Sequence, residues 1–152
     1  MSEEASLVTR WSALDRLHRR IDVAVEGRLH QRLGLGVSEF RALTALDSGR
    51  VESRTLQLRE LATQVGLSQS ATSRLVTRLR DRGLITTSTP AHDHRSVELR
   101  LTIVAQKVLR VGKPVLADAV CDAVRDLGEG DTDRALLRYL REGPAHGSGA
   151  QR

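Results

Sequence analysis

The sequence predicts a mainly α-helical protein with one small β-hairpin, built as a single domain over residues 1–152. Apolar residues recur at helical spacing along most of the chain, and one short segment near residue 100 alternates polar with apolar residues. Aromatic residues are limited to one Trp, one Tyr and one Phe, so Leu, Val and Ala must fill the core. This composition favours helices.

The first predicted element is a long helix over residues 7–33, preceded by a frayed segment over residues 1–6. Its apolar residues are three or four positions apart: Leu7, Trp11, Leu14, Leu17, Ile21, Val25, Leu29 and Leu33. Such a helix is roughly 40 Å long, which is about the width of a small domain. We expect part of its apolar stripe to face a second subunit; the alternative is a long core helix of a monomer.

A helix-turn-helix is predicted in the middle of the chain. A helix from Ser38 to Asp47 and a polar loop over residues 48–53 precede it. Residues 58–65 then form a short amphipathic helix, and Gly66-Leu67-Ser68 connects it to a second helix that ends before Gly83. Ser68 is the expected N-cap of that second helix. Two short helices joined by a turn containing glycine are typical of this motif.

The second helix combines a narrow apolar stripe with an unusual outward face. The stripe consists of Ala71, Leu75, Val76 and Leu79, and the outward face carries Gln69, Ser70, Thr72, Ser73, Arg74, Thr77, Arg78 and Arg80. Short hydroxyl side chains allow close approach to the DNA major groove, while Gln and Arg reach base edges and phosphates. The alternative is a basic, solvated amphipathic helix.

Two strands are predicted next, over residues 84–89 and 96–101, and the loop between them contains Asp93, His94 and Arg95. In the second strand, Val97, Leu99 and Leu101 alternate with polar residues, which is the period of a strand with one buried face. A hairpin that directly follows a DNA-reading helix is a wing, whose tip lies along the minor groove. Arg95 is the residue expected there, because the groove concentrates negative potential.

The last predicted elements are two helices and a disordered tail. Thr102 caps a helix to about Asp126, with a kink near Gly112-Lys113-Pro114; its apolar positions are Val104, Val108, Val111, Val115, Ala119 and Val124. Asp131 caps the final helix, and residues 143–152 form the tail. The terminal helices carry more apolar residues than a winged core needs. Residues 7–33 and 102–141 are therefore assigned to dimerisation, and residues 38–101 to a winged helix-turn-helix.

Composition narrows the class of function further. The net charge of +5 and the pI of about 10.5 suit a polyanionic partner. The single cysteine, Cys121, excludes an internal disulfide and favours the cytoplasm; it is expected to pack among apolar residues rather than act as an oxidation switch. No segment predicts membrane insertion, a cofactor site or an enzyme active site. His92, Asp93 and His94 are adjacent and seldom converge on one ion, so no metal site is expected.

This order of elements resembles the MarR family of bacterial transcriptional regulators over residues 7–140. The resemblance is carried by the run LRELATQVGLSQSATSRLVTRLRDRGLI from Leu58 to Ile85, by Asp93-His94-Arg95, and by the strand that ends at Leu101-Thr102. The chain departs from the family pattern directly after Thr102, where the family commonly has an acidic residue and then glycine but this chain has Ile-Val-Ala.

The resemblance implies a mainly α-helical winged helix-turn-helix homodimer that binds a near-palindromic DNA operator and usually represses transcription. Many members release DNA on binding a small, often phenolic molecule or on oxidation. By position, the predicted DNA-binding residues are Ser68, Gln69, Ser70, Thr72, Ser73, Arg74, Thr77, Arg78, Arg80, Asp93, His94 and Arg95. Arg78 is expected to hold phosphate, and Asp93 to orient Arg95 through a salt bridge.

Two alternatives remain open from the residues alone. Trp11, Arg16, Arg20 and Phe40 are predicted to line an effector cleft for an amphipathic ligand, and a position in the core is an equally good interpretation. For the whole chain, the second hypothesis is a winged-helix protein-interaction module that does not bind DNA.

Overall fold

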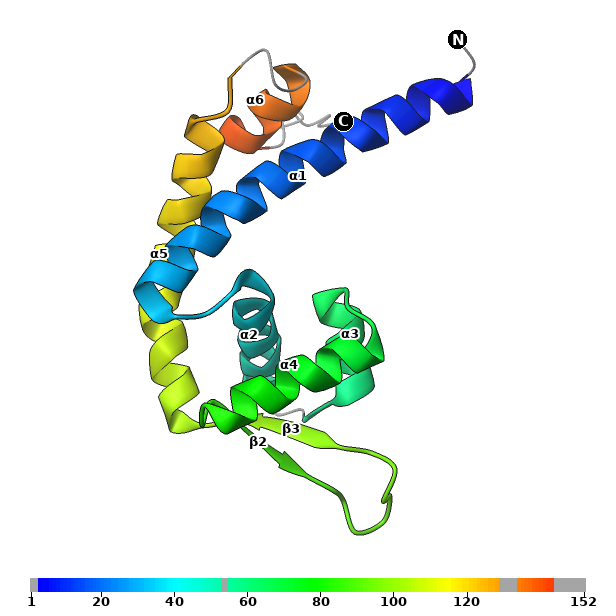
Figure 1. Cartoon of the computed structure of the whole chain (residues 1–152), viewed down its shortest axis with the longest axis vertical. Coiled ribbons are helices and arrows are strands. Elements are labelled where there is room, and N and C mark those ends of the chain that lie inside the picture. Colours follow the sequence, from blue (N-terminus) through cyan, green and yellow to red (C-terminus); the bar gives the residue numbers. More distant parts are fainter. Residues whose placement is uncertain (1–2, 53–54, 129–133, 144–152) are drawn as a thin grey trace, which may run out of the picture. The chain divides into compact units, whose positions relative to one another are not determined.

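The computed structural model describes residues 3–52, 55–128 and 134–143 (Figure 1). Its elements are α1 (Glu3–Leu33), α2 (Val37–Val51), β1 (Leu56–Gln57), α3 (Leu58–Val65), α4 (Gln69–Asp81), β2 (Ile85–Ser88), β3 (Glu98–Leu101), α5 (Ile103–Arg125) and α6 (Arg134–Glu142). The chain divides into two compact units. We call residues 29–115 the central unit, and residues 1–28 with 116–152 the terminal unit.

The predicted helix-turn-helix is confirmed in α3 and α4. Helix α3 ends at Gly66, whose positive φ of 74° is a conformation that favours glycine, and the Gly66 N–H donates to the Ala62 carbonyl. Ser68 caps α4, because its hydroxyl oxygen accepts a hydrogen bond from the Ala71 N–H at 3.2 Å. Leu75, Val76 and Leu79 are buried, so α4 is anchored by its apolar stripe.

The predicted hairpin is also confirmed, as antiparallel strands β2 and β3 with Ile85 opposite Leu101 and Ser88 opposite Glu98. The sequence did not predict β1, a two-residue strand that pairs with the other edge of β3, with Leu56 opposite Leu99. The sheet order is therefore β1-β3-β2. Strand β3 is held on both sides, and its Leu99 is buried.

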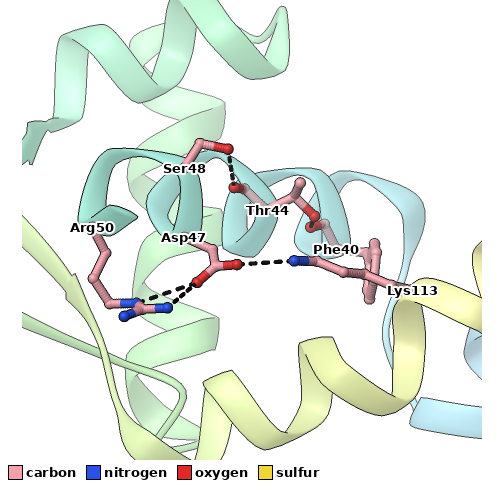
Figure 2. Close-up of polar contacts among 6 residues, drawn as sticks. All are labelled: Phe40, Thr44, Asp47, Ser48, Arg50 and Lys113. Atoms are coloured by element: carbon pink, nitrogen blue, oxygen red, sulfur yellow. Dashed lines mark hydrogen bonds and ion pairs between the residues drawn. The ribbon is translucent and has the colours of Figure 1, made fainter. Parts of the chain in front are cut away.

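The prediction of a loop over residues 48–53 is wrong for residues 48–51, because α2 continues to Val51. Two hydroxyl groups bond back along the helix instead of breaking it: Thr44 donates to the Phe40 carbonyl at 2.9 Å, and Ser48 donates to the Thr44 carbonyl at 3.1 Å (Figure 2). Gly49 is buried, so helix packing rather than local preference decides its conformation. Residues 53–54 lie outside the described part of the chain.

Other boundaries of the terminal helices differ from expectation. Helix α1 begins at Glu3 rather than after residue 6, and the acidic Glu3 and Glu4 in its first turn complement the helix dipole. Thr102 caps α5 as predicted, accepting from the Ala105 N–H at 3.2 Å. Pro114 lies inside α5. The expected cap Asp131 and residues 144–152 of the expected tail lie outside the described residues.

The buried face of α5 differs from the predicted one at its start. Val104 and Val111, assigned to the apolar stripe, are exposed, whereas Ala105 and Leu109 are buried. Gly112 continues this buried face. A Cβ atom at Gly112 would lie 2.4 Å from Cε2 of Phe40 and 2.8 Å from Cδ1 of Leu33. The glycine therefore allows the α5 backbone to pass directly over the Phe40 ring.

An ion network joins α2 and α5 within the central unit (Figure 2). Asp47, whose side chain is 14% exposed, accepts from Lys113 Nζ at 3.0 Å and from Arg50 Nη2 at 2.9 Å. Burial alone would raise the pKa of Asp47, but the hydrogen bonds and positive charges of Lys113 and Arg50 lower it below its ordinary value of 3.8. The charged carboxylate thus contributes to the stability of the fold.

Asp47→Asn is expected to reduce the free energy of unfolding by about 1 kcal/mol at neutral pH, since both cations are half-exposed and partly screened by solvent. Because the pKa of Asp47 is depressed in the folded state, its contribution is present above pH 3.8 and is lost as the pH falls through the folded value. Urea unfolding at pH 7 and pH 3 measures this. A difference between variant and wild type that persists unchanged at pH 3 would contradict the assignment.

In the terminal unit, Leu17, Leu127 and Leu137 form a buried cluster, and Arg28 Nη2 lies 3.1 Å from Asp122 Oδ2. Several large apolar side chains of this unit are exposed: Leu7, Val8, Trp11, Leu14, Val23, Tyr139 and Leu140.

Cys121 is exposed, so the expectation that it packs among apolar residues is wrong. None of the helices described here combines the length and the hydropathy needed to span a membrane.

Candidate nucleic-acid interface

The exposed face of α4 carries most of the side chains predicted to meet DNA. Gln69, Ser70, Ser73, Arg74, Thr77, Arg78 and Arg80 are all exposed, as is Ser68 at the N-cap. The Ser68 hydroxyl has a structural task as well, because it caps the helix and lies 3.3 Å from the Ser70 hydroxyl. The face therefore presents short hydroxyls, one amide and three guanidinium groups along a helix whose opposite side is buried.

The placement of Thr72 on this outward face is wrong. Thr72 is 0% exposed, and its hydroxyl donates to the Ser68 carbonyl at 2.8 Å. Thr72 lies three residues before Leu75 and four before Val76, which puts it on the buried side of the helix. The Thr72 side chain therefore packs and closes the first turn of α4, and it is not available to a ligand.

Asp93, His94 and Arg95 are exposed in the loop between β2 and β3. Asp93 Oδ1 accepts from the backbone N–H of Arg95 at 3.0 Å, and the Ser96 hydroxyl donates to the Asp93 carbonyl at 3.3 Å. The expected bond from Asp93 was a salt bridge to the Arg95 guanidinium. The structure instead has the carboxylate ordering the loop backbone at Arg95, which leaves the guanidinium exposed at the wing.

A cavity of about 400 Å³ brings the start of α4 and the wing together. It is lined by Gln57, Leu58, Arg59, Gln69, Asp93, Arg95, Ser96 and Val97. Gln69 and Arg95 were predicted from the sequence, but Gln57 and Arg59 were not. Arg59 is a single basic residue in the first turn of α3, and no spacing links it to the wing. Only the β1–β3 pairing, which was not predicted, brings this segment beside residues 95–97.

The residues predicted to line an effector cleft have different environments. Trp11 is 63% exposed, and Arg16 and Arg20 are also exposed, all on the part of α1 that belongs to the terminal unit. Phe40 is 2% exposed in the core of the central unit, which is the alternative weighed for it. The cleft stays a prediction.

Among the described residues, no group of three or more His, Cys, Asp or Glu side chains is placed to hold a metal ion.

A capped basic helix, preceded by a short helix and turn and followed by a hairpin that completes a three-stranded sheet with β1, defines a winged helix-turn-helix fold. Residues 33–96 match the model of the MarR family, and solved structures of MarR-family regulators share the fold of nearly the whole chain. The chain is therefore similar to the MarR family over residues 33–96, and it has the fold of MarR-family transcriptional regulators.

Three solved structures illustrate this similarity. Sco3205, a MarR family transcriptional regulator from Streptomyces coelicolor in complex with DNA, is 25% identical, with a TM-score of 0.72 over 93% of this chain and 84% of that one. The transcriptional regulator BldR from Sulfolobus solfataricus is 21% identical, with a TM-score of 0.72 over 93% and 96%. BpsR from Bordetella bronchiseptica is 20% identical, with a TM-score of 0.65 over 84% and 86%. No curated protein sequence matches the chain.

Proposed function

We propose that this protein is a homodimeric repressor that binds a near-palindromic operator and leaves it when a small molecule binds. The observation that carries the proposal is the cavity shared by Gln69 of α4 and Arg95 of the wing. Elements suited to the major and the minor groove are side by side there. This arrangement suits one duplex better than it suits a protein partner.

The side-chain chemistry of α4 and the wing suggests which part of the DNA each residue contacts. Gln69, Ser70, Ser73 and Arg74 lie in the first half of α4, so they approach base edges when the helix enters the major groove. Thr77, Arg78 and Arg80 lie further along and meet the phosphate backbone, as Arg forms two parallel bonds with a phosphate. Arg95 enters the adjacent minor groove, with His94 beside it.

Arg59 extends this interface beyond the residues predicted from sequence. It lines the cavity together with Arg95, and a DNA strand that separates a major from a minor groove must pass between the elements that read them. We infer that one backbone phosphate lies over this cavity, near Arg59 and Gln57. A phosphate contact fixes the register of the protein on the duplex without reading its sequence.

The exposed apolar side chains of the terminal unit support a homodimer. Leu7, Trp11 and Leu14 occupy one predicted stripe of α1 and are exposed in the protomer, as is Tyr139 of α6. Several exposed apolar side chains along one helix stripe are usually covered by a partner. A second copy with two-fold symmetry would place the two α4 helices in successive major grooves, roughly 34 Å or 10 base pairs apart. Acting on chromosomal DNA, the dimer would reside in the cytoplasm.

The proposed control by a small molecule has a precedent in a solved structure of the same fold. In BpsR, DNA binding is regulated by 6-hydroxynicotinic acid. For this chain, an effector that favours an unsuitable spacing of the two α4 helices by about 1 to 3 kcal/mol would weaken DNA binding roughly 5- to 150-fold. Small phenolic and aromatic acids are the compounds to titrate, and Trp11, Arg16 and Arg20 are the residues to substitute.

The full chain is expected to bind DNA from its own upstream region and to protect a site with two-fold symmetry in footprinting. Affinity should fall steeply with salt, by about 10³- to 10⁵-fold between 50 and 200 mM if six to ten phosphates are contacted. Sedimentation should show a dimer at micromolar concentration. Absence of any DNA complex at low salt, together with salt-insensitive binding of a protein partner, would favour the protein-interaction module instead.

A further inference from the structure

We propose that Glu39 is a positioning residue for DNA binding, which holds Arg78 of α4 so that the outer edge of its guanidinium faces a backbone phosphate. This inference rests on the proposed function. Glu39 lies in the first turn of α2 and is not part of α4 or the wing, so sequence spacing gives it no place in the interface.

The Glu39 carboxylate is itself held in place. Its side chain is 14% exposed, and its Oε2 accepts a hydrogen bond from the N–H of the N-cap residue Gly36 at 3.0 Å. The bond to a backbone donor restricts the rotation of the side chain. A carboxylate that is fixed and mostly removed from solvent can orient a neighbouring cation better than a freely rotating surface acid.

Two arginines of the α4 region meet this carboxylate. Arg78 Nε lies 3.5 Å from Oε1 of Glu39, and Arg82 Nη1 lies 3.6 Å from Oε2. Arg82 Nη1 also donates to the Gly34 carbonyl at 2.9 Å. The C-terminal end of α4 is therefore held to the first turn of α2 through two arginines that meet Glu39, and Arg82 also bonds the turn before α2.

The consequence differs for the two arginines. Arg82 ends α4 and is engaged by both Glu39 and a backbone carbonyl, so it anchors the helix. Arg78 is 58% exposed and meets Glu39 through Nε, which leaves its two terminal nitrogens for another partner. A phosphate can accept two parallel bonds from a guanidinium. Because Glu39 already restricts the long Arg78 side chain, less conformational entropy is lost when DNA binds.

A simple electrostatic role for Glu39 predicts the opposite effect on affinity. An acid near the DNA surface repels phosphate, so its neutralisation should strengthen binding if Glu39 acts only as a charge. If Glu39 positions Arg78, its neutralisation should weaken binding. The sign of the change therefore separates the two roles.

The test is Glu39→Gln, which removes the charge but keeps a side-chain oxygen that can accept from the Gly36 N–H. We expect Glu39→Gln to weaken binding of an operator fragment roughly 3- to 10-fold in the wild-type background. In an Arg78→Ala background the same substitution should have no such effect, because the residue that it positions is gone. The four chains form a double-mutant cycle, measured as Kd at several salt concentrations.

Asp81→Asn is the matched control. It removes the same charge from an acid at the end of the same helix, whose side chain is 67% exposed. Asp81 Oδ1 lies 3.9 Å from Nε of Arg80, which is too far for a hydrogen bond that would fix this arginine, so Asp81→Asn should leave affinity unchanged or raise it. An equal loss from Glu39→Gln with and without Arg78, or a gain like that expected for Asp81→Asn, would overturn the positioning role. If wild type itself binds no DNA at low salt, the proposed function fails first.

Should Glu39→Gln not fold, Arg78→Lys answers the same question. Lysine keeps the charge but cannot contact a carboxylate and a phosphate through separate edges of one planar group. The positioning role predicts weaker DNA binding by Arg78→Lys with an unchanged thermal midpoint. Retention of full affinity in Arg78→Lys would overturn the proposal.

Discussion

Gly112→Ala is expected to lower the free energy of unfolding by about 2 kcal/mol or more, although alanine is the better helix former. The added Cβ would lie 2.4 Å from the ring of Phe40 and 2.8 Å from Leu33. Since Phe40 is almost fully buried, its ring cannot swing into solvent to make room. Either the ring must repack or α5 must move away from α2, and both cost packing energy.

The matched control is Gly27→Ala, because Gly27 also lies inside a helix, but a Cβ atom added there would meet no other side chain or element of the described chain within 4 Å. Gly27→Ala should stabilise the fold slightly, by about 0.5 to 1 kcal/mol. Thermal and urea unfolding of both variants measure the contrast. Introducing Phe40→Leu into the Gly112→Ala chain should recover part of the loss; a neutral Gly112→Ala would show that the close approach of α5 is not needed.

Arg74→Ala and Arg95→Ala are each expected to weaken operator binding about tenfold or more. Both side chains are exposed on the two elements proposed to read DNA, and a well-placed arginine contributes about 1 to 3 kcal/mol of base discrimination. Arg74→Ala should also relax the preference for the base that it contacts. Arg95→Ala should lower affinity for sites with a narrow minor groove at the wing more than for others.

Arg110→Ala provides the comparison for loss of charge alone. Arg110 is an exposed residue of α5 outside α4 and the wing, so its removal should change affinity only slightly. Competition binding with a panel of single-base operator variants separates lost affinity from lost specificity. Affinities of Arg74→Ala and Arg95→Ala that match that of Arg110→Ala would contradict the proposed interface.

Local signals explain why the helix-turn-helix was predictable. Gly66 ends α3 in a left-handed conformation, and Ser68 and Thr102 cap α4 and α5 through their hydroxyl groups. These are the roles that the residue types suggest, so α3, α4 and the start of α5 could be predicted from the sequence. The end of α2 does not, because Ser48 and Gly49 have loop preferences that the buried helix overrides. Strand β1 is too short for any alternation to be visible, and it exists only because β3 offers an edge.

The candidate site was predictable to the extent that it depends on helical periodicity. The exposed positions of α4 follow from its apolar stripe, with the exception of Thr72. The Thr72 hydroxyl donates to the Ser68 carbonyl, so this side chain can be buried. Arg59 and Glu39 were missed for a different reason. Both act through contacts between segments distant in sequence, such as the 3.5 Å approach of Glu39 to Arg78, and no spacing within one helix reports such contacts.

Strand β3 is clamped between β1 and β2, and this has a consequence for how such a protein can be re-engineered. The residues that set the hairpin register, such as Leu99, are paired on both edges and do not depend on the loop beyond Ser88. Ser96 is buried and the Val97 carbonyl accepts from the Leu58 N–H, so both have to be kept. The residues between Ser88 and Ser96 can be exchanged for a longer, shorter or differently charged loop while the pairing of β3 stays in place. Exchanging this loop should change the contacts of the wing with the minor groove. The contacts of α4 with the major groove should stay the same.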